Sequence, residues 1–266
     1  LTGQVADLSR FSGLAGREIG GSADVAAGGS FTILGGTFDV AGQARGQDLR
    51  LSQPEADAIL AGASRIAFSL ARDTEGTEIR SLRLEARTLS LQAQGRLRTN
   101  GSNLTATLDF TDLSALGPGY RGTLAARAEL TADGPVNRLT VTGSGNGIGV
   151  GRAEADGLLQ GVTALALTAT EEDGRIQIDS FQLGNPQVTA TAGGSIDLRS
   201  GRQDLTLDLV LPDLGAMGRR YGGILSANAT LAGIAGERKL TLAGTGRDLR
   251  VGQAEADRLL GGIADL

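Results

Sequence analysis

The chain has 266 residues, a formal net charge of −5, and neither cysteine nor histidine. This composition excludes disulfides, thiolate chemistry, and the side chain that most often serves as a metal ligand and general base. The basic residues are spread along the chain, so there is no clustered positive patch for nucleic acid. We therefore expect no enzymatic activity, no cofactor and no metal.

Hydrophobic residues make up 40% of the chain but aromatic residues only 3%, so its apolar content is mainly leucine, isoleucine, valine and alanine. No apolar run approaches the length of a membrane-spanning helix, and there is no signal-peptide pattern. The chain begins at Leu1 within an apparent repeat and ends at Leu266 partway through another. We interpret it as a piece of a longer array, with any signal or anchor outside it.

A motif that recurs three times organises the chain. Its glutamates are Glu55, Glu154 and Glu255, each followed two residues later by an aspartate, so the period is close to one hundred residues. The only two tyrosines, Tyr120 and Tyr221, fall at corresponding places of successive copies. Such self-similarity predicts a repeat architecture. The predicted repeats are 1–104 (divergent or incomplete), 105–205, and 206–266 (truncated).

Most segments between these motifs alternate apolar and polar residues with period two, the pattern of strands with one apolar side. The clearest case is Leu-Thr-Leu-Asp-Leu-Val-Leu at 205–211. Turn dipeptides such as Asp173-Gly174 leave connections too short for a parallel crossover. We therefore predict an all-β fold, a long curled antiparallel meander. In the second copy its strands lie near 103–112, 122–132, 138–150, 162–171, 174–183 and 187–198.

Short helical inserts are predicted near 53–60, 153–160 and 254–261, where the Glu-Ala-Asp motifs stand. Ser52-x-x-Glu55 resembles a capping box, with Gly151 and Gly252 at the same place in the other copies. The leucines that end each insert are expected to fold over the end of the sheet. Glu154 and Asp156 could instead form an acid/base pair or a calcium site. Without a partner base or further ligands this reading is weak, and we favour a structural joint.

The leucine-rich faces of the strands have two interpretations. They could pack a closed two-sheet core, although a face rich in alanine and almost free of aromatic rings fills such a core poorly. They could also line an open trough, elongated and with an apolar interior, that accepts flexible acyl chains. We favour the trough. The predicted lining residues are Ile66, Phe68, Leu70, Leu82, Leu84, Leu89, Leu91, Leu104, Leu108, Phe110, Leu124, Leu139, Val141, Leu165, Leu167, Ile176, Ile178, Val188, Leu205, Leu207, Leu209, Leu240 and Leu242.

Three stretches carry a resemblance to a known family. They are Leu-Thr-Leu-Asp-Leu-Val-Leu-Pro-Asp-Leu at 205–214, Gly222 to Gly233, and Leu240 to Leu249. In style and pattern they resemble the β-repeat region of the TamB family, the inner-membrane-anchored subunit of the bacterial translocation and assembly module. The resemblance extends over essentially the whole chain, without an invariant motif. It implies a β-taco or repeating β-groove, as in AsmA-like proteins, located in the periplasm.

The resemblance also implies a role in outer-membrane biogenesis and protein secretion. Its partner would be a BamA-like outer-membrane barrel, contacted through regions outside this chain. Its cargo would be phospholipid acyl chains or nascent outer-membrane protein segments. The alternative reading is a surface or adhesin-like β-array with a closed core and protein partners. A carbohydrate-acting enzyme is a third class, and it would require the repeated carboxylates to gather in one cleft.

Overall fold

The computed structural model describes residues 2–32, 35–98, 101–234 and 236–265. Over these residues it contains sixteen strands, four short α-helices and three 3-10 helices. The chain divides into two compact units, Leu1–Gly134 and Pro135–Leu266, which we call unit 1 and unit 2. The predicted fold class, an all-β antiparallel meander with short helical inserts, is confirmed.

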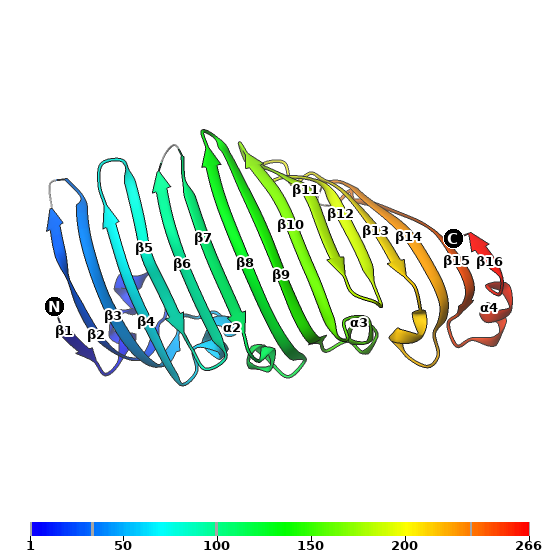
Figure 1. Cartoon of the computed structure of the whole chain (residues 1–266), viewed down its shortest axis with the longest axis horizontal. Helices are drawn as coiled ribbons and strands as arrows, with labels where there is room; N and C mark the ends of the chain where they lie inside the picture. The colour runs from blue at the N-terminus through cyan, green and yellow to red at the C-terminus, as the bar shows by residue number, and fades with distance from the viewer. Residues whose placement is uncertain (1, 33–34, 99–100, 235, 266) are drawn as a thin grey trace. The chain divides into compact units, whose positions relative to one another are not determined.

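Unit 1 is an antiparallel sheet in which each strand pairs with the strand that follows it in the chain (Figure 1). Its first and last strands do not pair with each other within the described residues, so the sheet does not close into a barrel. The strands are β1 (Thr2–Val5), β2 (Gly20–Thr32), β3 (Thr37–Arg50), β4 (Ala63–Arg72), β5 (Gly76–Glu85), β6 (Leu89–Arg98), β7 (Asn103–Phe110) and β8 (Tyr120–Asp133).

Unit 2 repeats this arrangement, again with sequential antiparallel pairing and no closure within the described residues. The strands predicted for the second repeat agree with those observed to within two residues at their ends, the scatter expected of boundaries. The strands of unit 2 are β9 (Val136–Val150), β10 (Val162–Glu172), β11 (Arg175–Gly184), β12 (Thr189–Asp197), β13 (Gln203–Leu211), β14 (Gly222–Gly233), β15 (Lys239–Arg250) and β16 (Ile263–Asp265).

The helical segments lie at one end of the strands in each unit, the lower end in Figure 1. Three of them are the joint helices α2 (Pro54–Ile59), α3 (Ala153–Leu158) and α4 (Ala254–Leu259), as predicted. The 3-10 segments η1 (Leu8–Phe11), η2 (Leu113–Leu116) and η3 (Leu214–Met217) were not predicted; α1 (Ser12–Ala15) follows η1 directly. We call this end of each sheet the joint end and the opposite end the turn end.

The predicted capping box at Ser52 and Glu55 is wrong. The N-cap residues of the joint helices are Gln53, Arg152 and Gln253, and none of their side chains caps the helix. Ser52 has φ +58° and donates its hydroxyl to the carbonyl of Glu18. The equivalent positions are Gly151 (φ +75°) and Gly252 (φ +78°). Because the chain turns there through the left-handed region, glycine suits the site, and it is one residue before the cap.

The aspartate of each Glu-Ala-Asp motif fastens its helix to the preceding strand. Asp57, Asp156 and Asp257 each accept a hydrogen bond through Oδ1 from the backbone amide six residues earlier, at donor–acceptor distances of 2.5, 2.6 and 2.7 Å. The geometry is the same in all three copies. The second carboxylate of the motif therefore has a structural task, as the joint interpretation requires.

The buried core of each unit is small and lies at the joint end. In unit 2 it consists of Val188, Leu211, Leu214 and Leu249, with Leu158 of α3 packed against it. The buried hydrophobic residues of unit 1 are Leu60, Leu89 and Leu113, again beside α2 and η2. No described side chain in either unit is less than 2% exposed. The rest of each sheet is therefore a single layer.

Candidate functional site: an uncovered apolar face

The residues predicted to line a trough share one face of unit 1. Cross-strand partners run from Ile66 to Leu84, from Leu84 to Leu91, and from Leu91 to Leu108. Partners in an antiparallel ladder point to the same side of the sheet. We call this surface the apolar face of unit 1. Its predicted members are Ile66, Phe68, Leu70, Leu82, Leu84, Leu89, Leu91, Leu104, Leu108, Phe110 and Leu124.

Unit 2 has a corresponding apolar face. One row crosses it from Val141 through Leu167 and Phe181 to Ala192, and continues to Leu207. Its predicted members are Leu139, Val141, Leu165, Leu167, Ile176, Ile178, Val188, Leu205, Leu207, Leu209, Leu240 and Leu242. Whether these residues contact a ligand stays a prediction; the structure places them on one face of their unit.

Burial shows that no second layer covers these faces. Among the predicted lining residues only Leu89 and Val188 are buried, and both stand at the joint end. Leu207, Leu240 and Leu242 are 37%, 60% and 66% exposed, and the others are half-buried. A closed two-sheet core would enclose most of them. The closed-core interpretation therefore does not describe either unit.

The total exposed surface agrees with uncovered faces. The structure exposes 16184 Å² to solvent. Compact monomers of this length expose about 11,000 Å².

On each apolar face the side chains become more exposed along the strands, from the joint end to the turn end. In β4 the inward positions run from Ser64, which is 2% exposed, through half-buried Ile66, Phe68 and Leu70, to exposed Arg72. In β10 the same series begins at buried Thr163 and ends at Glu171, which accepts a hydrogen bond from Asn137. The joint end of the face is thus buried, whereas the turn end is more exposed and carries charged side chains.

The repeated carboxylates do not form a cleft within a unit. In unit 2 the motifs of α3 and α4 are separated by the strands β10 to β15. Glu154 forms an ion pair with Arg220 at 3.0 Å, and the guanidinium of Arg220 lies 4.8 Å from the ring centre of Tyr221. Hydrogen bonds from its own backbone amide and from Arg220 lower the pKa of Glu154. No group of three or more potential metal-ligating side chains occurs among the described residues.

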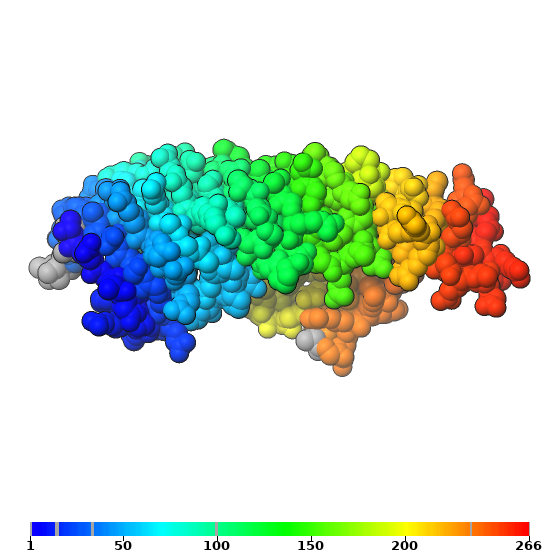
Figure 2. Space-filling model, turned by 90° about the horizontal axis from the view of Figure 1, so that it is seen from below, coloured from blue at the N-terminus to red at the C-terminus, as the bar shows by residue number. Residues whose placement is uncertain are grey.

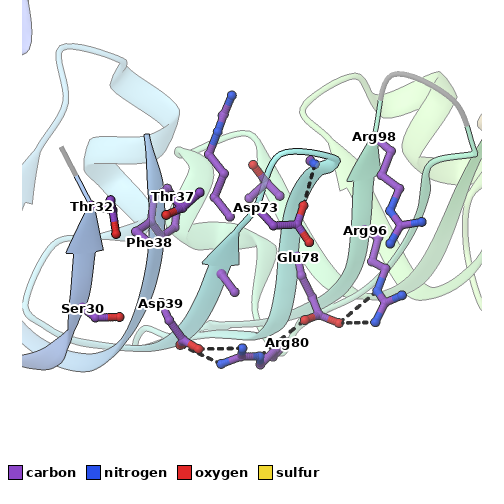
Figure 3. A pocket seen from close by; sticks show the side chains of 14 residues that line it. Ser30, Thr32, Thr37, Phe38, Asp39, Asp73, Glu78, Arg80, Arg96 and Arg98 are labelled. Atoms are coloured by element: carbon purple, nitrogen blue, oxygen red, sulfur yellow. Dashed lines mark hydrogen bonds and ion pairs between the residues drawn. The ribbon is translucent and has the colours of Figure 1, made fainter. Parts of the chain in front are cut away.

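A charged pocket lies at the turn end of unit 1 (Figure 3) and was not predicted. It has a volume of about 360 Å³ and is lined by residues from β2 to β6. Arg80 binds Asp39 and Arg96 binds Glu78, each at 2.8 Å, and Arg80 also reaches Glu78 at 3.4 Å. Asp39 and Glu78 point away from the apolar face, because their neighbours Val40 and Ile79 stand on it. We call this series of ion pairs, Asp39–Arg80–Glu78–Arg96, the ladder. Because its acidic and basic side chains neutralise one another, we interpret it as a structural feature that braces the strands.

The ladder predicts a selective change of pKa. Hydrogen bonding to Arg80 lowers the pKa of Asp39, whereas the pKa of Glu78 is lowered mainly by Arg96 and less by Arg80. In an Arg80→Ala variant the pKa of Asp39 should therefore return toward its ordinary value of 3.8, while that of Glu78 stays lowered. NMR titration of the side-chain carboxyl carbons measures both. An unchanged Asp39 titration would contradict the ladder, and Arg83→Ala serves as the control.

The structure and the sequence were compared with known proteins. No helix among the described residues is both long and apolar enough to cross a bilayer. Searches of protein-family models, of curated proteins and of solved structures give no match to this chain. The chain is therefore characterised by its own geometry, two antiparallel sheet units whose apolar faces are uncovered.

Proposed function

We propose that the chain carries phospholipid acyl chains along its apolar faces. The observation that supports this best is a half-exposed apolar face in each unit, continuous across neighbouring strands. Each methylene removed from water gains about 0.8 kcal/mol, so many equivalent leucines can hold an acyl chain without a specific pocket. Passage needs no nucleophile and no metal, which fits the composition.

This is the function that the resemblance to the TamB family implies, and the proposal includes its setting. The chain would act in the periplasm as part of an inner-membrane-anchored protein, together with a BamA-like outer-membrane barrel. Head groups would stay at the polar turn end of the sheet. Nascent outer-membrane protein segments are the second cargo that an uncovered apolar face could accept, because such strands also present one apolar side.

The proposal is tested by placing a charge on the apolar face. Leu207→Asp puts a carboxylate in the centre of the unit 2 face, where an adjacent acyl chain would bury it at a cost of several kcal/mol. The variant is expected to lose most of the phospholipid that co-purifies with the chain, measured by mass spectrometry. Leu84→Asp is the corresponding change in unit 1.

Val210→Asp is the matched control. Val210 lies on the same strand with similar exposure, 41% against 37% for Leu207, but on the opposite face. Its lipid content should equal that of the unmodified chain. Absence of lipid from the unmodified chain under conditions that preserve bound lipid would refute the proposal, as would equal losses in Leu207→Asp and Val210→Asp. Bound polypeptide in place of lipid would favour the protein cargo.

A further inference from the structure

The apolar face of unit 1 carries a single charge, and it stands in the last row at the turn end. We call this cross-strand row the rim row; it consists of Phe31, Phe38, Arg72, Thr77 and Leu97. Phe31 and Leu97 are 66% and 39% exposed, so the row is open to solvent. From the row of Ser64 to the rim row, every other paired position described on this face is apolar, glycine, serine or threonine. Arg72 is therefore the one charge that an occupant of the face would meet.

Arg72 is also free of partners within the part of the chain that the structure describes. It forms no ion pair and no side-chain hydrogen bond there, whereas Arg80, Arg96 and Arg98 at the same end all pair with acids. The carboxylate of the adjacent Asp73 accepts hydrogen bonds from two amides of its own turn. The guanidinium of Arg72 thus lies exposed among apolar side chains, and no acid neutralises it.

The corresponding row of unit 2 has the opposite charge, and that charge is satisfied. The row runs through Asn137, Glu171, Ile176, Ile196, Gln203 and Gly233. Glu171 stands at the place of Arg72 and accepts hydrogen bonds from the side chain of Asn137 at 2.7 Å and from the amide of Gly174 at 2.8 Å. These two bonds lower the pKa of Glu171, so it is ionised at neutral pH.

We propose that Arg72 binds the phosphate of a phospholipid whose acyl chains lie on the apolar face of unit 1, and that unit 2 has no such anchor. The inference rests on the proposed function and adds to it the residue that recognises the lipid phosphate. Leu70 precedes Arg72 on the same side of β4, about 7 Å along the strand. An acyl chain packed on Leu70 and Phe68 therefore brings its glycerol phosphate to the guanidinium, whose forked donors match phosphate oxygens.

The two ends of unit 1 give the lipid its direction. The joint end, from which Figure 2 views unit 1 in blue to green, is packed around the buried side chains of Leu60, Leu89 and Leu113. A charged head group therefore fits the turn end, where Arg72 stands. In unit 2 the carboxylate of Glu171 would repel a phosphate at the same place, so that face would accept acyl chains without selecting for phosphate.

The test measures which lipid unit 1 takes up, in a Leu207→Asp background that blocks the face of unit 2. The chain is incubated with vesicles of dioleoyl phosphatidylglycerol that contain dioleoylglycerol, which has the same acyl chains and no phosphate. Mass spectrometry of the re-isolated chain gives the ratio of the two bound lipids. Arg72→Gln should lower the ratio of phosphatidylglycerol to dioleoylglycerol about fivefold, the upper range for one exposed ion pair. Arg72→Lys keeps the charge and should keep most of the ratio.

Arg65→Gln is the matched control, because Arg65 is exposed on the same strand but on the opposite face. It should leave the ratio unchanged, and retained dioleoylglycerol shows that each variant is folded. In a Leu84→Asp background, which leaves the face of unit 2, Arg72→Gln should have no effect. The proposal is overturned if Arg72→Gln keeps the ratio in the Leu207→Asp background, or if Arg65→Gln lowers it equally. Absence of both lipids from the unmodified chain would instead remove the proposed function itself.

A second measurement separates a lipid phosphate from free phosphate. The Nε–Hε resonance of Arg72 should shift when phosphatidylglycerol is added and stay in place with inorganic phosphate, because the acyl chains supply most of the affinity. An equal shift with inorganic phosphate would make Arg72 a site for free anions and would overturn the assignment to a lipid.

Discussion

Gly157→Ala is expected to destabilise unit 2 by about 1–3 kcal/mol, the range of overpacked sites. Alanine is the better helix former by about 1 kcal/mol, so an exposed glycine in a helix would give the opposite sign. Here the new Cβ would collide with the backbone carbonyl oxygen of Ala216. Backbone cannot swing aside as a flexible side chain does. α3 and η3 must therefore separate, which opens the cluster around Leu214.

Urea unfolding combined with amide hydrogen exchange measures this effect and locates it. The loss of protection should concentrate in η3, α3 and the adjoining strand ends, while unit 1 keeps its exchange rates. Gly184→Ala is the matched control, because nothing lies within 4 Å of a Cβ at that position. A Gly157→Ala chain as stable as the unmodified one would mean that α3 and η3 do not touch as closely as the structure indicates.

Asn185→Ala is expected to cost about 2–4 kcal/mol, because one side chain satisfies four polar groups at a packed joint. Its amide nitrogen donates to the carbonyl of Leu158 and to the hydroxyl of Thr163, each at 2.8 Å. Its oxygen accepts from the amides of Gln187 and Val188 at 2.8 and 2.9 Å. Alanine would leave all four without this partner, and Thr163 is only 3% exposed. Thermal unfolding of unit 2 measures the loss.

Unit 1 offers the reciprocal experiment. Ala86 stands at the position of Asn185, since both begin a turn closed by a bond from their amide to the carbonyl three residues later. Near it the hydroxyls of Ser64 and Thr88 are buried without a hydrogen-bond partner among the described residues. Ala86→Asn should supply the missing amide to Ser64 and stabilise unit 1 by about 1 kcal/mol. Destabilisation would show that the two joints are not equivalent.

The strands and joints were predictable because their signals are local. Period-two leucines and Asp173-Gly174, with φ +52° and +79° in a tight hairpin turn, need no tertiary information. The pattern failed where a β-bulge changes the alternation. Bulges between Ile79 and Leu82, and between Ile178 and Phe181, move the inward position by one residue. Ile79 and Phe181 were therefore missing from the predicted face although they belong to it.

Other features depend on contacts that one sequence does not display. The η segments could have been predicted from the recurring Asp-Leu pairs at 7–8, 112–113 and 213–214. That the leucine of such a pair packs beside a joint helix, however, is visible only in the structure. The hydrogen bonding of Asn185 likewise depends on Thr163, which is distant in sequence. The alternation of apolar and polar residues does not predict whether the apolar face is covered, because a covered face and an uncovered face give the same sequence pattern.

The sequential pairing of the strands determines how each unit can acquire its structure. Every ladder joins neighbours in the chain, so most loops that close during folding are short and cost little entropy. The helix–η contacts are the exception, since η2 and η3 meet helices that precede them by four strands. We infer that hairpins form first and that the joint ends lock last. A chain pulled from one end should then come apart in steps of strand pairs rather than all at once, as linear repeat arrays do.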